Sequence, residues 1–245
     1  MDVISHRGLC EEAVENTLPA FRKARESGFS FMETDLRVTV DGHIVAWHDT
    51  DFQRIGNSKR AIHAMTLKEV RAVALPFGSQ VATLDEIFQE FPEVCFTFDI
   101  KPETGDLVID ALAAWARRRT AAAEDWLIGR ARFLFWRRSQ EKRFQSLFPS
   151  AKFYARKWEC ICAGLCVVSG LSWLLNIDTN KIYSVPPKFL GLSLMNRSIV
   201  DRYHSLGVLV LAYLPTGVFL ECALEAGFDQ ILIDVSSPEI IGHPH

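Results

Sequence analysis

The sequence predicts a single α/β domain and, within that class, a (β/α)8 TIM barrel. Short apolar runs alternate with amphipathic stretches along the whole chain of 245 residues, and this alternation is typical of a parallel sheet whose strands are joined by helices. Eight such runs are present, which favours a closed barrel over an open doubly wound sheet. No Gly/Ser-rich or Pro-rich linker interrupts the pattern, so we expect one barrel domain over residues 1–245.

The expected strands are short and rich in apolar residues. They lie at residues 2–5, 31–36, 94–100, 132–136, 152–155, 181–185, 207–213 and 230–235. The run 94–100 is apolar almost throughout, as in a strand that is covered on both faces. Residues 37–47 predict a hairpin attached to the second strand, because the dipeptide Asp41-Gly42 favours a tight turn.

Local signals mark the starts of three expected helices. Residues 17–28 form an amphipathic stretch, with Thr17 as the expected N-cap and Gly28 beyond the C-terminal end. Two capping boxes, in which a Thr is followed three residues later by a Glu, predict further helix starts at 66–69 and 83–86.

Charge and composition exclude some partners and leave one question open. The formal net charge of −3 argues against a dedicated nucleic-acid binder, which usually carries a basic surplus. Residues 117–157, however, contain twelve Lys/Arg against three acids, a local surplus of nine positive charges. This stretch is either a solvated helical flank or a surface that attracts an anionic substrate or membrane.

The longest uncharged segment tests whether the chain crosses a membrane. Residues 160–177 are eighteen residues without a charge, at the lower margin for a transmembrane helix, but two Gly, two Ser and one Asn dilute them. We therefore expect a helix of a soluble domain that is buried or touches a membrane. The N-terminus lacks the basic and apolar regions of a signal peptide, so we expect a cytoplasmic protein, with peripheral membrane contact through 117–177 as an option.

The chain has six cysteines and no pattern that unites them. They are Cys10, Cys95, Cys160, Cys162, Cys166 and Cys222. No CxxC pair or completing His spacing indicates a zinc site. We expect buried, reduced thiols.

Ionisable residues gather where the expected strands end. His6, Glu33, Asp99 and Asp234 lie at or near such ends, and a barrel carries its catalytic groups at the carboxyl ends of its strands. Glu33 and Asp35 are two residues apart and therefore share one face of a strand. Their charges repel unless a cation lies between them.

These acids predict a divalent metal site. Carboxylate oxygens suit Mg²⁺ or Ca²⁺, and Asp99 on a neighbouring strand offers a third ligand to join Glu33 and Asp35. An alternative is that Asp99 is only the ion-pair partner of Lys101, which lies two residues further on the same face.

Two histidines and two cations complete the expected site. His6 should face the acids from the first strand, although a histidine held in a local ion pair is an alternative. His48 follows the hairpin. Imidazoles exchange protons near neutral pH, so this pair suits acid–base chemistry. Arg7 and Lys101 would hold the oxygens of a phosphate, which favours phosphoryl chemistry.

These residues carry a family resemblance. The ordered series HRG, ENTLPAF and ETDLRVTVDGHIVAWHD, followed by FDIKPE, resembles the glycerophosphodiester phosphodiesterase family. The likeness is strong over residues 3–103 and looser over 181–241, where SVP at 184–186 and the stretch from GFDQILID to Ile241 resemble later family landmarks. Two departures stand out: Asp99 occupies a position that is often Glu, and LAYLPTG at 211–217 replaces the usual seventh-strand segment, with Tyr213 as a potential substitute aromatic residue.

The resemblance implies a barrel enzyme of lipid metabolism that hydrolyses glycerophosphodiesters to glycerol phosphate and an alcohol with Mg²⁺ or Ca²⁺. It implies a small inserted cap over residues 37–80. By position, the metal ligands are Glu33, Asp35 and Asp99, the acid–base pair is His6 and His48, and the phosphate contacts are Arg7 and Lys101.

The sequence leaves alternatives for both the substrate and the reaction. The basic and apolar stretches of 117–177 tilt the expected substrate from a water-soluble glycerophosphodiester toward a lysophospholipid. A non-catalytic barrel that binds metal or phosphate is a second function class. A Mg²⁺-dependent lyase or isomerase with Lys101 as its base is a third.

Overall fold

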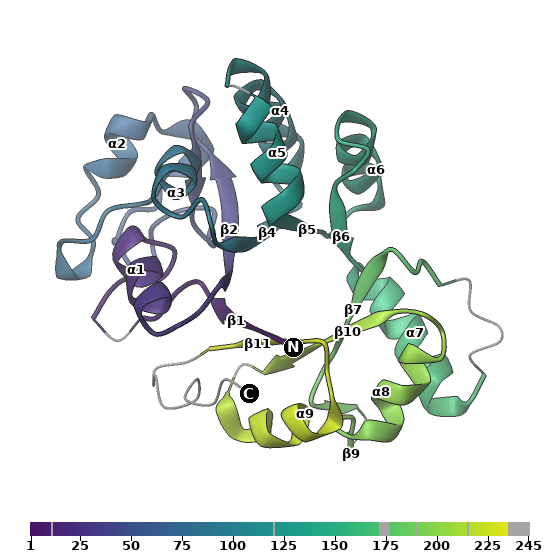
Figure 1. Ribbon diagram of the computed structural model, residues 1–245. Helices are drawn as coiled ribbons and strands as arrows, with labels where there is room; N and C mark the ends of the chain where they lie inside the picture. The colour runs from purple at the N-terminus through teal and green to yellow at the C-terminus, as the bar shows by residue number, and fades with distance from the viewer. Residues whose placement is uncertain (11, 120, 172–176, 190, 215, 235–245) are drawn as a thin grey trace.

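The protein forms a closed eight-stranded parallel barrel, as the sequence predicts (Figure 1). The computed structural model describes residues 1–10, 12–119, 121–171, 177–189, 191–214 and 216–234. Around the barrel the strands are β1 (Asp2–His6), β2 (Phe31–Val38), β4 (Cys95–Ile100), β5 (Ala131–Phe135), β6 (Lys152–Tyr154), β7 (Lys181–Val185), β10 (Leu209–Leu214) and β11 (Gln230–Ile233). Parallel pairing of β1 with both β2 and β11 closes the ring. All eight predicted strands are confirmed.

Helices cover the outside of the barrel (Figure 1). They are α1 (Leu18–Glu26), α2 (Leu67–Arg71), α3 (Leu84–Glu90), α4 (Gly105–Arg118), α5 (Ala121–Arg130), α6 (Arg138–Leu147), α7 (Lys157–Ser169), α8 (Arg197–His204) and α9 (Leu220–Ala226). In the part of the chain that the structure describes, loops also contain the short 3-10 helices η1 (Ile62–Ala64), η2 (Pro76–Gly78) and η4 (Gly217–Phe219). After β7 the chain adds a two-stranded antiparallel ribbon of β8 (Lys188–Phe189) and β9 (Leu192–Ser193).

Alternation along the strands separates two apolar layers. Outward-facing aromatic residues such as Phe98, Phe133 and Phe135 belong to the large core between the barrel and its helices. A smaller cluster built around Ile4, Tyr154, Ile182 and Leu211 is separate from it. Tyr154, Thr97 and Gln230 are joined by side-chain hydrogen bonds of 3.0 and 2.8 Å, so polar groups of β4, β6 and β11 meet there without leaving the Tyr154 hydroxyl unpaired.

The segment between β2 and α3 builds its own small core. Strand β3 (Ile44–Ala46) pairs antiparallel with the end of β2, and Gly42 takes the positive φ of +81° that the turn requires. Trp47, Phe52 and Ile62 belong to an apolar cluster distinct from the barrel core. Both predicted capping boxes are present, at the starts of α2 and α3.

Strand β2 continues into the predicted hairpin. The run expected at residues 31–36 extends to Val38, because its last residues pair with β3. Its pairing with β4 ends at Leu36 and Ile100. Glu33 and Asp35 therefore lie within the strand, near the carboxyl end of its barrel portion.

One further local expectation was confirmed in position only, and one was wrong. Thr17 is the N-cap residue of α1, but its hydroxyl donates to the backbone carbonyl of Val14 at 2.5 Å instead of accepting a hydrogen bond from the helix. The six cysteines are free, as expected, but none is buried: three are exposed and three are partly exposed. Cys95 begins β4, and the others lie in the loop after β1, in α7 and in α9.

Helix α7 ends inside the uncharged segment 160–177. Helix α7 ends at Ser169, and residues 172–176 lie outside the described residues. Within the described ranges, every helix is too short or too polar to span a bilayer.

Candidate active site

Three buried carboxylates meet at the carboxyl ends of neighbouring strands. The parallel pairing of β2 with β4 sets Asp35 opposite Asp99, and Glu33 lies two residues earlier on the same face. One oxygen of each acid lies within 4.8 Å of the others. The structure therefore brings together all three residues predicted as metal ligands.

Two cations flank the acid cluster. Arg7 Nε lies 3.1 Å from Asp35 Oδ2. Lys101 Nζ lies 2.6 Å from Asp99 Oδ2 and 2.8 Å from Asp35 Oδ1, but only the contact with Asp99 has hydrogen-bond geometry. The predicted ion pair between Asp99 and Lys101 thus exists within the cluster, and it does not exclude a metal role for Asp99.

The pKa values of the acids show that their charges are not fully balanced. Burial raises the pKa of Glu33 well above its usual value, and the charges of Asp35 and Asp99 add to this effect. Burial also raises the pKa of Asp99, although Lys101 opposes the shift. For Asp35, burial acts in the same direction, but Lys101 and Arg7 outweigh it and lower the pKa. A group of acids at this depth gains from an additional cation.

The donor set fits a hard divalent cation. Carboxylate oxygens are the ligands that Mg²⁺ and Ca²⁺ prefer. Among the described residues, the buried Oε2 of Glu33 accepts no hydrogen bond, which leaves a lone-pair site in the cluster. The residues present therefore suit the metal that the sequence predicts.

Lys101 remains a cation in this environment. Burial lowers the pKa of Lys101, but Asp99 and Asp35 raise it more, and the net pKa lies above the usual value. A lysine that acts as a general base needs the opposite shift. This arrangement argues against the lyase or isomerase alternative and favours electrostatic contact with an anion.

Both predicted histidines are held at Nδ1 by a carboxylate. His6 Nδ1 lies 2.8 Å from Asp234 Oδ1, and its Nε2 lies 3.6 Å from Glu33 Oε2. His48 Nδ1 lies 2.8 Å from Asp49 Oδ1. Holding Nδ1 in this way orients the ring and leaves Nε2 to exchange protons. His6 is therefore in a local ion pair and also beside the acid cluster.

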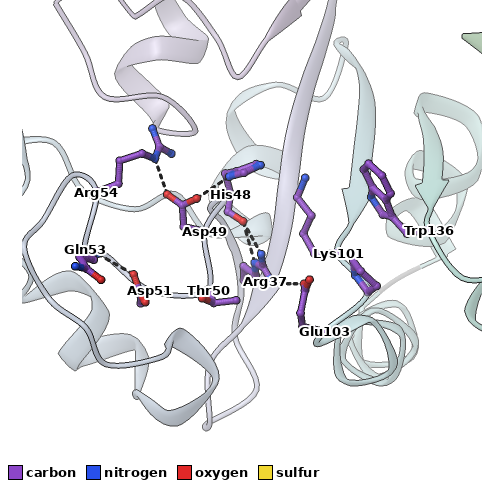
Figure 2. Close-up of a pocket in the computed structure, with 11 residues that line it drawn as sticks. Arg37, His48, Asp49, Thr50, Asp51, Gln53, Arg54, Lys101, Glu103 and Trp136 are labelled. Atoms are coloured by element: carbon purple, nitrogen blue, oxygen red, sulfur yellow. Dashed lines mark hydrogen bonds and ion pairs between the residues drawn. The ribbon is translucent and has the colours of Figure 1, made fainter. Parts of the chain in front are cut away.

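A network of ion pairs connects His48 to the barrel. Arg54 Nε donates to Asp49 Oδ2 at 2.6 Å, beside the contact of Asp49 with His48 (Figure 2). The other end of the Arg54 guanidinium donates to Glu15. Glu15 in turn accepts from Arg7 at 3.0 Å. The network fixes the loop after β3 relative to the loop after β1. No sequence signal predicts it, because Glu15 and Arg54 are distant in the chain.

Two other neighbours of the acids were missed. Trp136 Nε1 donates to Asp99 Oδ1 at 2.7 Å, and Asn16 Nδ2 donates to Asp35 Oδ2 at 3.0 Å. Trp136 directly follows β5, so its place at a strand end was a usable signal. Asn16 belongs to the ENT motif, and its φ of +60° is a conformation that Asn tolerates better than most residues.

The loop after β1 is unusually tight. Arg7 has a φ of +59° and Gly8 a φ of +83°. A Cβ on Gly8 would lie 2.7 Å from the backbone of Ala20 in α1. Only glycine allows this close approach, which holds Arg7 against the acids.

Two cavities meet at the site. One is a polar cleft of about 810 Å³ between the loop after β3 and the loops after β4 and β5 (Figure 2). The other, of about 570 Å³, contains His6, Glu33 and Asp99 and continues into an apolar region. Both are lined by His48, Lys101 and Trp136. The acid cluster thus borders the second cavity, and His48, Lys101 and Trp136 lie between it and the polar cleft's remaining lining.

Comparisons with solved structures confirm the barrel. A glycerophosphoryl diester phosphodiesterase domain from Mycobacterium tuberculosis superposes with a TM-score of 0.77 over 97% of this chain and 96% of that one, at 17% identity. A phosphodiesterase from Oleispira antarctica, solved with the product sn-glycerol-3-phosphate, gives 0.70 over 98% and 95%, at 18% identity. At these identities the likeness establishes the fold.

Curated relatives match the first part of the chain. A glycerophosphodiester phosphodiesterase from Caldanaerobacter subterraneus is 34% identical over 110 residues, which are 42% of this chain and 45% of that protein. A lysophospholipase D from Rattus norvegicus is 29% identical over 118 residues, which are 43% of this chain and 38% of that protein. The matched part therefore spans less than half the length of either relative.

The family match covers the first part of the barrel. Residues 6–144, more than half of the chain, match the glycerophosphoryl diester phosphodiesterase family. This range begins at His6 and includes the acid cluster, both flanking cations and His48. On this match and on the barrel that carries it, the chain belongs to the glycerophosphoryl diester phosphodiesterase family.

Proposed function

We propose that this chain hydrolyses glycerophosphodiesters to glycerol phosphate and an alcohol with the help of a divalent cation. One observation carries the proposal. Three buried carboxylates, two imidazoles and two cations gather at one end of the barrel. Both histidines, both cations and two of the acids line the same cavity. Membership of the family supports it independently.

The residues divide the chemistry between them. Arg7 and Lys101 attract the phosphodiester and hold its non-bridging oxygens. His6 and His48 act as the acid–base pair. One imidazole takes a proton from the attacking water as its oxygen bonds to phosphorus, and the other gives a proton to the alkoxide as its bond to phosphorus breaks. Asp234 and Asp49 keep the two rings oriented through Nδ1.

A metal would be held by Glu33, Asp35 and Asp99. A bound Mg²⁺ or Ca²⁺ supplies charge stabilisation to the phosphoryl oxygens. The proposal includes both ions. Asp99 is one methylene shorter than the Glu often found at its position, and substitution of Asp99 distinguishes the two ions.

The test is turnover of a substrate panel with and without metal. Glycerophosphocholine, glycerophosphoethanolamine, lysophosphatidylcholine and a nitrophenyl phosphodiester are each assayed in EDTA, Mg²⁺ and Ca²⁺. From the three glycerol-containing substrates we expect glycerol phosphate or its acyl ester as the phosphorylated product, and from the nitrophenyl phosphodiester we expect nitrophenol, in each case only with metal. Full activity after exhaustive dialysis against EDTA, or no turnover with either ion, contradicts the proposal.

We further propose that lysophospholipids are substrates. The cavity that contains the acids has an extensive apolar lining, and a lysophospholipase D is among the relatives. A lysophospholipid also carries the glycerol phosphate group that the site would recognise. Release of choline from lysophosphatidylcholine in the panel tests this part separately.

We propose that the protein contacts a membrane peripherally, through a smaller surface than the whole basic stretch 117–157. Arg119, Arg143 and Arg156 are already paired with acids. The βα topology also divides this stretch between the two ends of the barrel, since residues that follow strands lie at the opposite end from residues that precede them. A membrane would therefore meet the rim of the carboxyl end, where Trp136 and Trp158 are exposed.

Residues 37–80 are proposed as a small cap over the polar cleft. They include the separate apolar cluster, and the loop that carries His48 lines the cleft. Binding of glycerol phosphate in the presence of Ca²⁺ should then slow amide hydrogen exchange over residues 48–56. Unchanged exchange in a saturated complex contradicts a capping role.

A further inference from the structure

The cavity of about 570 Å³ has two chemically different ends. One end holds Arg7 and Lys101 beside the acid cluster. From there the cavity continues between α7 and the loop that follows β7, and we call this part the apolar arm. Its lining includes Ile161, Leu165, Val168, Val185, Phe189 and Leu194.

One face of α7 is turned toward the arm. The residues of this helix that line the cavity are Lys157, Cys160, Ile161, Gly164, Leu165 and Val168. Their spacing of three, one, three, one and three places them along a single helical face. Ala163 and Val167 are buried in the packed core, against which Cys160 and Val168 also pack at their edge. The helix therefore contributes one side to the core, while the face that carries Ile161, Gly164 and Leu165 forms a wall of the arm.

Gly164 lies in the middle of that wall. A Cβ added there would meet only the hydroxyl of Tyr203, at 3.6 Å, which is ordinary contact. Gly8 is the opposite case, because backbone lies 2.7 Å from its added Cβ. A glycine inside a helix is unfavourable relative to alanine, and close packing does not require it at position 164. Its effect is to keep the arm wide.

We infer that the apolar arm binds the single hydrocarbon chain of the substrate, with Gly164 as the residue that sets its specificity. The inference rests on the proposed function, and it assigns the chain of a lysophospholipid to a definite place. A molecule with an anionic phosphate at one end and a hydrocarbon chain at the other matches the two ends of the cavity. The arm lies beyond residue 144, where the family match ends.

The arm predicts a dependence on chain length. Burial of each methylene contributes about fourfold in affinity, equivalent to ~0.8 kcal/mol. Within a series of lysophosphatidylcholines kept below their micelle concentrations, kcat/KM should therefore rise with chain length until the arm is full. Glycerophosphocholine, which has the same phosphodiester and no chain, is the reference substrate.

The decisive variant is Gly164→Leu, with Gly129→Leu as its matched control. Gly129 is also a helical glycine, in α5, and an added Cβ meets nothing within 4 Å. Exclusion of only two methylenes predicts a loss of about sixteenfold. We expect the ratio of kcat/KM for lysophosphatidylcholine to that for glycerophosphocholine to fall at least tenfold in Gly164→Leu and to remain unchanged in Gly129→Leu.

A binding measurement separates failure of the arm from failure of the proposed function. Dodecylphosphocholine and phosphocholine are titrated calorimetrically into the wild-type protein and both variants. We expect dodecylphosphocholine alone to bind Gly164→Leu at least tenfold more weakly. An unchanged substrate ratio, or equal dodecylphosphocholine affinity, overturns the arm. Absence of turnover in a wild-type protein that still binds dodecylphosphocholine selectively overturns only the proposed function.

A smaller substitution serves if Gly164→Leu does not fold. Gly164→Ala adds one methyl group at ordinary contact distance from Tyr203 and favours the helix. It should lower the ratio mainly for the longest chains that the wild-type arm accepts. A uniform effect on every chain length contradicts the inference.

Discussion

The two sides of the barrel mouth follow different physical rules. On the side of β1, β2 and β4, acids, histidines and cations are held by short polar contacts. On the side of β7 and α7, the same cavity has apolar walls and a glycine. We call these the polar side and the apolar side.

The contrast explains why the sequence predicts the polar side and does not predict the apolar side. Acid–base and metal chemistry needs particular functional groups at fixed distances, so its residues recur as motifs. Binding a hydrocarbon needs only volume and apolar surface, which many combinations of residues supply. The family match accordingly includes the polar side and ends before α7.

The largest effect should follow from removal of an acid on the polar side. Asp35→Ala removes the acid that contacts both Arg7 and Lys101. Loss of metal-derived charge stabilisation, worth several kcal/mol, predicts at least about a 10³-fold drop in turnover of both acylated and unacylated substrates. Turnover of lysophosphatidylcholine and glycerophosphocholine measures it.

A thermal melt gives the same test without activity. Saturating Ca²⁺ or Mg²⁺ should raise the Tm of the wild-type protein, since a ligand that binds only the folded state stabilises it. Asp35→Ala should lose this shift. Asp125→Ala, a change at an exposed acid of α5, is the control and should keep it. An Asp35→Ala protein that keeps both the shift and its turnover contradicts the metal site.

The next largest effect should follow from substitution of the histidines. His6→Ala and His48→Ala should each lower kcat/KM at least ~10²-fold, because a positioned acid or base contributes about that much. The wild-type profile of kcat/KM against pH should be bell-shaped, and each substitution should remove one limb. Metal affinity should change little by comparison. A loss below tenfold means that the substituted histidine is a bystander.

Asp99 tests how closely the polar side is fitted to its ion. Its two oxygens already accept hydrogen bonds from Lys101 and Trp136, and the packed strands beside it cannot shift by a methylene. Mg²⁺ requires near-octahedral geometry at ~2.0–2.1 Å, whereas Ca²⁺ accepts looser shells at ~2.3–2.6 Å. Asp99→Glu should therefore weaken Mg²⁺-supported turnover about tenfold more than Ca²⁺-supported turnover.

The amide variant decides between the two interpretations of Asp99. Asp99→Asn should reduce turnover with both ions, because it removes a ligand charge. If Asp99→Asn keeps wild-type metal affinity and rate, Asp99 is only the partner of Lys101. The third ligand must then be sought elsewhere.

The fold was predictable because strand period and helix signals agree along the chain. All eight barrel strands were found from short apolar runs, and both capping boxes formed as expected. The predicted hairpin also formed, as the pairing of β2 with β3. Details of single side chains were less predictable: the hydroxyl of Thr17 bonded to Val14 instead of capping its helix, and the cysteines expected to be buried are not.

The sequence predicts which residues form the site, but it does not predict the network of contacts between their side chains. Strand ends pointed to His6, Glu33 and Asp99, since a barrel gathers such positions at one end. The sequence could not show that Arg54 joins Asp49 to Glu15, because loops that are distant in the chain meet only in the fold. For the same reason it could not show that one face of α7 lines a cavity.

The smallest effect should follow from a substitution at the rim of the apolar side. Trp158 lies one residue inside the start of α7 and is 74% exposed, so its ring is free to enter a lipid interface next to Lys157, which lines the cavity. Trp158→Ser should weaken binding to vesicles that contain anionic lipid by about threefold, since it removes one aromatic anchor and no charge. Leu147→Ser is the control, because Leu147 is an exposed apolar residue at the end of α6, which leads to the opposite end of the barrel.

Turnover of monomeric glycerophosphocholine is measured in parallel. If both variants lose vesicle binding equally, the contact is not at the mouth. If neither variant loses it, the apolar side receives its substrate from solution, and the exposed tryptophan has no part in membrane binding.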